Sequence, residues 1–290
     1  MSELDDLRAA TRDLLEDNAP VRSNTEDNPG IWKRFAVEMG LAALPVEASL
    51  SWTATVAEET GRVLLRAPFL TTAVAAAVTK DPGLADGSLT AAVQTDDVVP
   101  YASGADVLLD LRGSEALLVK DFTATPVETL DPTRSAATVA HHGGEAVGSA
   151  DDARDLLHLL TAAECVGAAQ RVLELVVEHL LVRTQFGRPL GSFQALRHKV
   201  ADLTVLLEAA RSTTWYAASE PEDFAVVAPL ARALASEAFV TVTGESIQLF
   251  GGIGFTWEHD AHLYFKRAWT TALAADSKTL KQLAFDRSHV

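Results

Sequence analysis

The chain contains very little cysteine and comparatively few basic residues. Its 290 residues include one cysteine, Cys165, so no disulfide can form within the chain, which fits a reducing compartment. Cys165 lies in an apolar helical pattern and is expected to be a small buried side chain. Lysine and arginine number 24 against 40 acidic residues, giving a formal net charge of −16. Because nucleic acids and anionic membranes are bound through basic surfaces, neither is expected as a partner.

Long uncharged apolar segments are also missing. No window reaches the roughly eighteen consecutive apolar residues that a membrane-spanning helix requires. The first residues are acidic (Glu3, Asp5, Asp6) and lack the basic-then-apolar order of a secretory signal. With 48% apolar and 22% charged residues, the composition is that of a globular protein, and we expect a cytoplasmic location.

The most informative stretch begins at Arg183 and reads Arg-Thr-Gln-Phe-Gly-Arg-Pro-Leu-Gly-Ser-Phe-Gln. Before and after it, apolar residues recur at three- and four-residue spacing, which predicts two helices. Its two glycines and one proline prevent a straight continuation, so we predict an antiparallel hairpin with a tight turn. The tip carries Arg183, Phe186 and side-chain amides, and a guanidinium fork suits a pyrophosphate. The alternative is a capped turn with a solvated arginine.

This stretch resembles the loop of the acyl-CoA dehydrogenase family that lies against FAD. A second stretch, residues 248–255 (Gln-Leu-Phe-Gly-Gly-Ile-Gly-Phe), resembles the other FAD-contacting turn of that family. The resemblance is strongest from Ser149 to Arg267 and weaker over the N-terminal third. It implies the fold of that family, FAD as the cofactor and an acyl-CoA as the substrate.

The pattern along the chain divides it into three predicted domains. Residues 1–80 are a helical lobe, with helical patterns at 4–17, 31–40, 53–65 and 73–78. Residues 81–148 are a reduced β domain of about four or five strands, with apolar runs at 89–93, 107–111, 116–119 and 136–140. Residues 149–290 are an antiparallel four-helix bundle that begins at a capping Ser149, with helices at about 151–182, 193–218, 222–249 and 258–286. The predicted fold class is mostly α and acyl-CoA dehydrogenase-like.

Several features that the resemblance implies are missing. No tryptophan lies between Trp52 and Trp215, whereas full-length family members carry a tryptophan-bearing strand beside the flavin ring. Family members remove the substrate α-proton with a carboxylate at one of two positions. These positions fall on Ala275 and Leu157, and neither side chain can accept a proton. Asp276 would serve only after a local shift, since one residue along a helix turns a side chain by about 100°.

Other polar residues on the predicted helices have simpler interpretations. Glu164, Glu237 and Glu245 are expected on solvated faces or in ion pairs between helices rather than as bases. His259 and His262 have a spacing that can bind a metal, but no third ligand follows in register, so no metal is expected.

What the chain retains is the half of an FAD site that a neighbouring chain supplies in the tetramers of the family. The predicted cofactor-binding residues are Arg183, Phe186, Gln194, Gln248, Gly251 and Gly252, and no catalytic residue is predicted. The chain resembles the short subunits of heteromeric acyl-CoA dehydrogenases, especially those of actinobacterial steroid catabolism. The resemblance implies a longer homologous partner that carries the base, in a heterodimer or an α2β2 heterotetramer.

The complex implied by this resemblance would oxidise an acyl-CoA, with a steroid-derived one as the best guess, to the 2,3-enoyl-CoA. An electron-transfer flavoprotein would take the electrons. Two alternatives stay open. One is a self-sufficient homo-oligomeric enzyme that uses Asp276, and the other is a non-catalytic structural or regulatory subunit.

Overall fold

The first third of the chain folds into helices. The structure is a computed structural model that describes residues 2–289. The helices of this part are α1 (Glu3–Asn18), α2 (Pro29–Trp32), α3 (Leu44–Glu47), α4 (Leu50–Arg62), α5 (Phe69–Thr79) and α6 (Pro82–Ala85). The helices predicted at 4–17, 53–65 and 73–78 are confirmed as α1, α4 and α5. The single helix predicted at 31–40 is wrong, because a π-helical turn, Lys33–Glu38, follows α2 directly.

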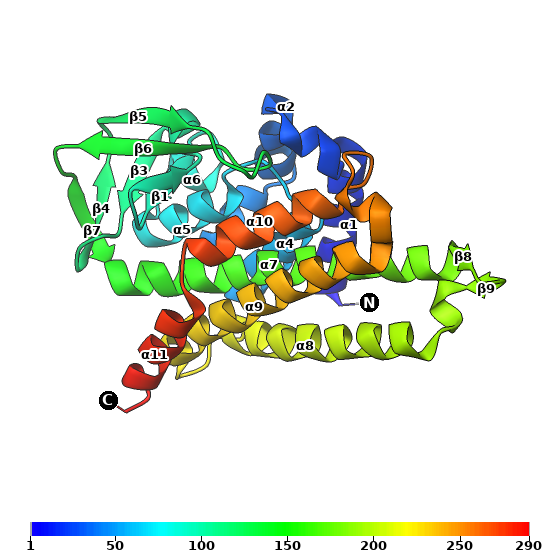
Figure 1. Cartoon of the computed structure of the whole chain (residues 1–290). Coiled ribbons are helices and arrows are strands. Elements are labelled where there is room, and N and C mark those ends of the chain that lie inside the picture. Colours follow the sequence, from blue (N-terminus) through cyan, green and yellow to red (C-terminus); the bar gives the residue numbers. More distant parts are fainter. Residues whose placement is uncertain (1, 290) are drawn as a thin grey trace.

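Two small sheets lie beside α5 and above the start of the next long helix (Figure 1). Their strands are β1 (Ala91–Gln94), β2 (Val98–Pro100), β3 (Val107–Asp110), β4 (Glu115–Val119), β5 (Phe122–Val127), β6 (Ala136–His141) and β7 (Glu145–Ser149). One sheet has the order β1-β3-β4-β7 with β1 and β3 parallel, and the other has the antiparallel order β2-β6-β5. The four predicted runs are β1, β3, β4 and β6. The strands β2, β5 and β7 bury few positions, so a search for apolar runs misses them.

The C-terminal half consists of long helices that lie side by side (Figure 1). They are α7 (Ala150–Val182), α8 (Gln194–Ala218), α9 (Phe224–Phe250), α10 (Ala261–Leu273) and α11 (Ser277–Arg287). As predicted, Ser149 caps α7, and its hydroxyl accepts a hydrogen bond from the Asp152 amide at 3.2 Å. The continuous helix predicted at 258–286 is wrong. Helix α10 ends at Leu273, and Asp276 is the N-cap of the next helix, α11, so the two helices are separate.

Helix α9 is the central helix of this half. It packs against α7, α8, α10 and α11, which explains why it is apolar on nearly all sides. By length and composition the segment Phe224–Phe255 would also pass as a membrane span, although charged residues interrupt it. Most of its apolar window is buried within the fold, as expected for the core helix of a bundle.

The predicted fold class is confirmed. A helical N-terminal lobe, a small β region and a helical C-terminal half follow one another along the chain. The division into three domains at residues 80 and 148 stays a prediction. Helix α5 ends at Thr79, α6 (Pro82–Ala85) still precedes β1, and α7 starts at Ala150.

Candidate functional site

The predicted hairpin tip is present at the end of α7 (Figure 1). The Arg183 amide donates to the His179 carbonyl at 2.8 Å and closes the helix, and two short strands follow, β8 (Thr184–Gln185) and β9 (Arg188–Pro189). The two residues between the strands, Phe186 and Gly187, have φ values of +54° and +79°. Positive φ at both positions is the requirement of a type I′ turn. A bulky residue at positive φ is uncommon, since its side chain is crowded by the backbone in that conformation.

The side chains of this tip face solvent. Phe186 is 90% exposed, and its ring meets that of Phe193 edge to face, with 6.2 Å between the ring centroids. The guanidinium carbon of Arg188 lies 4.0 Å from the centroid of the Phe193 ring. Residues 179–201 contain no acidic residue, and within the described residues 2–289 Arg183 forms no ion pair. The tip is therefore a cationic and partly aromatic surface on a chain of strongly negative net charge.

The second predicted turn follows α9. Gly251 has a φ of +68° and a ψ of −144°, a conformation open essentially to glycine alone. A Cβ added at Gly251 or Gly252 would meet nothing within 4 Å, so the backbone there is open to close approach. A Cβ at Gly254 would lie 2.9 Å from the Ile247 carbonyl oxygen, so the turn packs tightly onto α9 at that point.

The fold brings the base of the hairpin and the second turn to the same end of the bundle. The Phe250 ring lies 5.3 Å from the His179 ring and 4.0 Å from the His259 ring, measured between centroids. A hydrogen-bonded ion pair of 2.7 Å joins Lys199 of α8 to Glu245 of α9. Partial burial, together with the nearby Arg183, lowers the pKa of His179.

The six predicted cofactor-binding residues are all exposed on this end of the molecule: Arg183, Phe186, Gln194, Gln248, Gly251 and Gly252. Within residues 2–289 no hydrogen bond joins their side chains to one another, so one chain does not assemble them into an enclosed site.

The carboxylate nearest to the expected base position has another role. Asp276 is exposed, and its Oδ2 accepts hydrogen bonds of 2.9 Å from both the amide and the hydroxyl of Thr279. These hydrogen bonds, the backbone one first, lower the pKa of Asp276. A carboxylate that caps a helix in solvent is a poor general base, so the structure weighs against the self-sufficient alternative.

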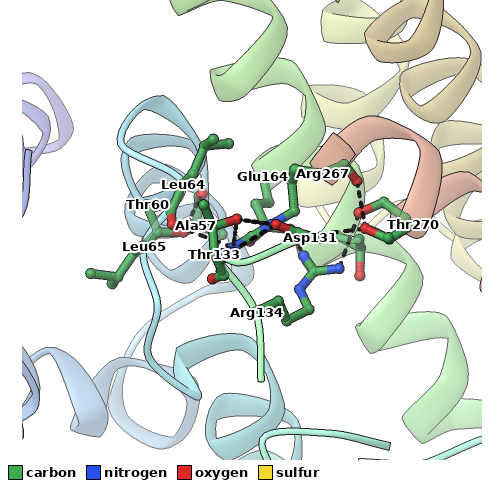
Figure 2. Close-up of polar contacts among 12 residues, drawn as sticks. Ala57, Thr60, Leu64, Leu65, Asp131, Thr133, Arg134, Glu164, Arg267 and Thr270 are labelled. Carbon is green, nitrogen blue, oxygen red and sulfur yellow. Dashed lines mark hydrogen bonds and ion pairs between the residues drawn. The ribbon is translucent and has the colours of Figure 1, made fainter. Parts of the chain in front are cut away.

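Glu164 lies in a buried ion-pair network shown in Figure 2. Its Oε1 pairs with Arg267 at 2.9 Å and its Oε2 with Arg134 at 2.7 Å. Arg267 is fully buried and also pairs with Asp131 at 2.9 Å. Burial raises the pKa of Asp131, but Arg267 and then Arg134 outweigh that effect and hold it below its usual value. The network joins the β5–β6 connection to α7 and α10 and leaves Glu164 no freedom to act as a base.

Sequence reasoning missed most of this network. A signal was present in α10, where Arg267 shares a buried face with Tyr264, Ala268 and Thr271. A charged residue on such a face predicts a buried partner, although it does not say which one. The ion pairs predicted for the other two carboxylates are confirmed, since Glu245 pairs with Lys199 and Glu237 with Lys281.

The two histidines after α9 belong to the turn. His259 Nδ1 accepts from the Ala261 amide at 3.1 Å, and His262 Nδ1 lies 2.7 Å from the His259 carbonyl oxygen. Across the residues that the structure describes, no three His, Cys, Asp or Glu side chains are grouped as metal ligands.

The known proteins to which this chain is similar in sequence are acyl-CoA dehydrogenases. The sequence profile described as acyl-CoA dehydrogenase, C-terminal domain, matches residues 155–275. The chain is 38% identical over 276 residues to acyl-CoA dehydrogenase IpdE2 of Mycobacterium tuberculosis, covering 89% of this chain and 86% of that protein. For IpdE2 of Mycolicibacterium smegmatis the identity is 36% over 288 residues, and 92% of each protein is covered. Acyl-CoA dehydrogenase FadE34 of Mycobacterium tuberculosis is 33% identical over 73% of this chain but only 34% of its own length.

Solved structures with this fold include two whose descriptions name a pair of proteins. The Tcur3481-Tcur3483 steroid ACAD G363A variant superposes with a TM-score of 0.86 at 25% identity, covering 99% of this chain and 98% of that one. The ChsE4-ChsE5 complex from Mycobacterium tuberculosis superposes with a TM-score of 0.85 at 20% identity, covering 97% and 96%.

Proposed function

The chain belongs to the acyl-CoA dehydrogenase family of FAD-dependent oxidoreductases, and we propose that it is the shorter subunit of a two-chain dehydrogenase. In this proposal it supplies the pyrophosphate and adenosine half of an FAD site. A longer homologous subunit supplies the half around the flavin ring together with the catalytic base, so the chain is active only within the complex.

The observation that carries this proposal is the exposed hairpin tip. Phe186 holds an unfavourable backbone conformation and leaves 90% of its surface in solvent. Arg183, beside it, has no acidic partner among residues 2–289. Within residues 2–289, the Phe186 ring is not stabilised by burial and the Arg183 guanidinium is not stabilised by an ion pair. A ligand shared with a second subunit accounts for both features.

The predicted residues fit the phosphate-rich end of FAD. The Arg183 fork can donate two parallel hydrogen bonds to a pyrophosphate. The open backbone at Gly251 and Gly252 allows close approach of a phosphate or ribose. Gln194 and Gln248 would add amide donors and acceptors, while Phe186 would pack against the cofactor. Bound FAD would supply the acceptor for the hydride that leaves the β-carbon of the substrate.

The base is assigned to the partner because neither family position of the base holds a carboxylate in this chain, and the two acidic residues considered in their place, Asp276 and Glu164, are unsuited to the task. The two positions at which family members carry it are Leu157, packed against the core, and Ala275. A general base needs a pKa near the working pH and room to reach the substrate α-proton. Asp276 lacks the first property, and Glu164, held by two arginines, lacks the second.

The comparisons support a two-chain assembly, which we place in the cytoplasm as a heterodimer or an α2β2 heterotetramer. Two solved structures with this fold are described by pairs of protein names. The match to this chain covers only 34% of the length of FadE34. The rest of FadE34 is long enough to contain a second acyl-CoA dehydrogenase-like unit that corresponds to the longer subunit. The proposed reaction converts an acyl-CoA to the 2,3-enoyl-CoA and passes electrons to an electron-transfer flavoprotein. The steroid ACAD likeness supports a steroid-derived acyl group.

A non-catalytic structural subunit is the other candidate. It would stabilise a partner without touching FAD, and the buried network of Figure 2 would be its main feature. The exposed Arg183 and Phe186 count against it, because a purely structural bundle gains nothing from them.

Co-expression with the longer homologue tests the proposal. We expect the chain alone to be poorly soluble or colourless and the complex to be yellow, with about one FAD for each pair of chains. Flavin absorbance and protein concentration after purification give this ratio. Stoichiometric flavin on the chain alone would overturn the two-chain proposal.

A further inference from the structure

Three exposed apolar side chains occupy every second position of the turn between α9 and α10. Ile253 is 43% exposed, Phe255 81% and Trp257 71%. Single exposed apolar residues are ordinary on protein surfaces, but three within five residues, two of them aromatic, form a concentrated patch. Trp and other aromatic side chains supply much of the binding energy at protein interfaces.

The turn is held in place before any partner arrives. Arg22, from the N-terminal lobe, donates through Nη1 to the Trp257 carbonyl at 2.8 Å, and its Nε pairs with Asp260 at 2.8 Å. The Thr256 amide donates to the Ile253 carbonyl at 3.0 Å. Because the backbone is fixed at both ends, docking of this turn loses little conformational entropy.

The Trp257 ring is also fixed. The Lys266 ammonium lies 4.6 Å from its centroid, and the His262 ring meets it edge to face with 4.6 Å between centroids. Lys266 forms no ion pair within the described part of the chain, residues 2–289, so its charge is available to a carboxylate. The result is an immobilised aromatic anchor with a cation at its rim.

The position of the turn indicates which molecule would contact it. It directly follows Gly251 and Gly252, which the proposed function places at the FAD that two subunits share. A second subunit that reaches the same FAD must come close to the residues that follow. A nucleotide base could also stack on an exposed tryptophan. However, Lys266 covers part of the ring, and three protruding side chains suit a protein pocket better than a flat base.

We propose, resting on the proposed function, that the Ile253–Trp257 turn is a docking anchor for the longer subunit. Trp257 enters an apolar pocket of that subunit, Phe255 packs at the edge of the pocket, and Lys266 pairs with a carboxylate at its rim. The contact is made by protein atoms and forms whether or not FAD is bound.

The test measures assembly of the co-expressed complex after its flavin has been removed. Sedimentation velocity over a dilution series gives the dissociation constant of the two chains. We expect Trp257→Ala to weaken assembly by about thirtyfold or more and Trp257→Phe by about threefold. The matched control is Trp269→Ala, which removes a tryptophan that is 45% exposed on α10, outside the turn, and should leave assembly unchanged.

A second variant covers the case in which Trp257→Ala yields no soluble complex. Lys266→Glu keeps the aromatic anchor and should weaken assembly about tenfold at low salt, with a smaller effect at high salt. Unchanged assembly in this variant and in whichever tryptophan variants are soluble would overturn the docking inference.

Two other outcomes are separable. Normal assembly with weakened FAD binding in Trp257→Ala would make the turn a nucleotide surface. Failure of the unmodified chain to bind the longer homologue at all would remove the proposed function itself, and the docking anchor with it.

Discussion

Gly61 of α4 and Gly167 of α7 lie where these two helices cross, each against the backbone of the other helix. A Cβ added to Gly61 would stand 2.0 Å from the Glu164 carbonyl oxygen, and one added to Gly167 would stand 1.8 Å from the Glu58 carbonyl oxygen. Backbone atoms cannot move aside as a flexible side chain can. The N-terminal lobe therefore approaches the bundle as closely as it does only because both positions lack a side chain.

The first prediction concerns this crossing. Gly61→Ala should lower the free energy of unfolding by about 3 kcal/mol, because the two helices must separate to accept one methyl group. Gly244→Ala in α9 is the control, since its Cβ would meet only a Phe265 ring carbon at 3.9 Å. There, better helix propensity should raise stability by up to about 1 kcal/mol. Urea denaturation measures both, and equal effects would contradict the crossing argument.

The second prediction concerns the buried network. Asp131→Ala removes one partner of the fully buried Arg267, and loss of one member of a buried ion pair typically costs about 3–5 kcal/mol. In Arg267→Met the long apolar side chain replaces the cation. The double variant with Asp131→Ala should therefore be less destabilised than the sum of the two single changes. A double-mutant cycle by chemical denaturation gives the coupling energy, and simple additivity would show that the pair contributes nothing.

The third prediction concerns pH. Burial raises the pKa of Asp155 to about 6, although Arg287 of α11 holds the carboxylate at 2.7 Å. A raised folded-state pKa gives stability that is complete below the unfolded-state pKa and is lost as the pH rises through about 6. Between pH 4 and pH 7, ionisation of Asp155 should lower the free energy of unfolding of the unmodified chain by roughly 2 kcal/mol. The Asp155→Asn variant should not show this decrease. The unfolding free energies of the unmodified chain and of Asp155→Asn are measured across that range. If the stability of the unmodified chain rises with pH relative to the variant, the folded state favours the ionised carboxylate and the prediction is wrong.

The fourth prediction concerns Arg183. Arg183→Ala should lower the FAD affinity of the complex by about ten- to a hundredfold, since it removes a charge-assisted contact of about 1.5–3 kcal/mol. Arg183→Lys should recover only part of the affinity, because an ammonium cannot copy the planar fork. Assembly and substrate preference should not change. Titration of the flavin-free complex with FAD is the measurement, with Lys33→Ala as a distant surface control. Unchanged affinity would mean that the tip is only a capped turn.

The fifth prediction concerns Asp276. Asp276→Asn should leave turnover by the complex nearly intact, because its carboxylate caps α11 and the base is assigned to the partner. An asparagine can still accept the two hydrogen bonds from Thr279, so α11 should persist. A loss of about 10² to 10⁴ in turnover, with the helical content preserved, would restore the self-sufficient alternative.

The sequence by itself determined the local structure of the bundle and the family to which the chain belongs. The period of apolar residues predicted α7 and α8, and the Gly-Pro-Gly interruption predicted the turn between them. These signals are local, because a helix or a tight turn depends on the few residues within it. The two motifs at residues 183–194 and 248–255 are sufficient to predict the family from the sequence.

The tertiary structure decided which groups meet. Arg267 finds Asp131 across 136 positions of sequence and Glu164 across 103, and no local pattern encodes such a pairing. The role of Asp276 was equally hidden, since a base and a helix cap differ only in how the chain turns around the carboxylate. Which polar groups lie together is set by long-range packing, and packing depends on every helix at once. That is the physical reason why the sequence could name candidate residues for this site, while only the fold showed which of them are exposed and without an ion pair among residues 2–289.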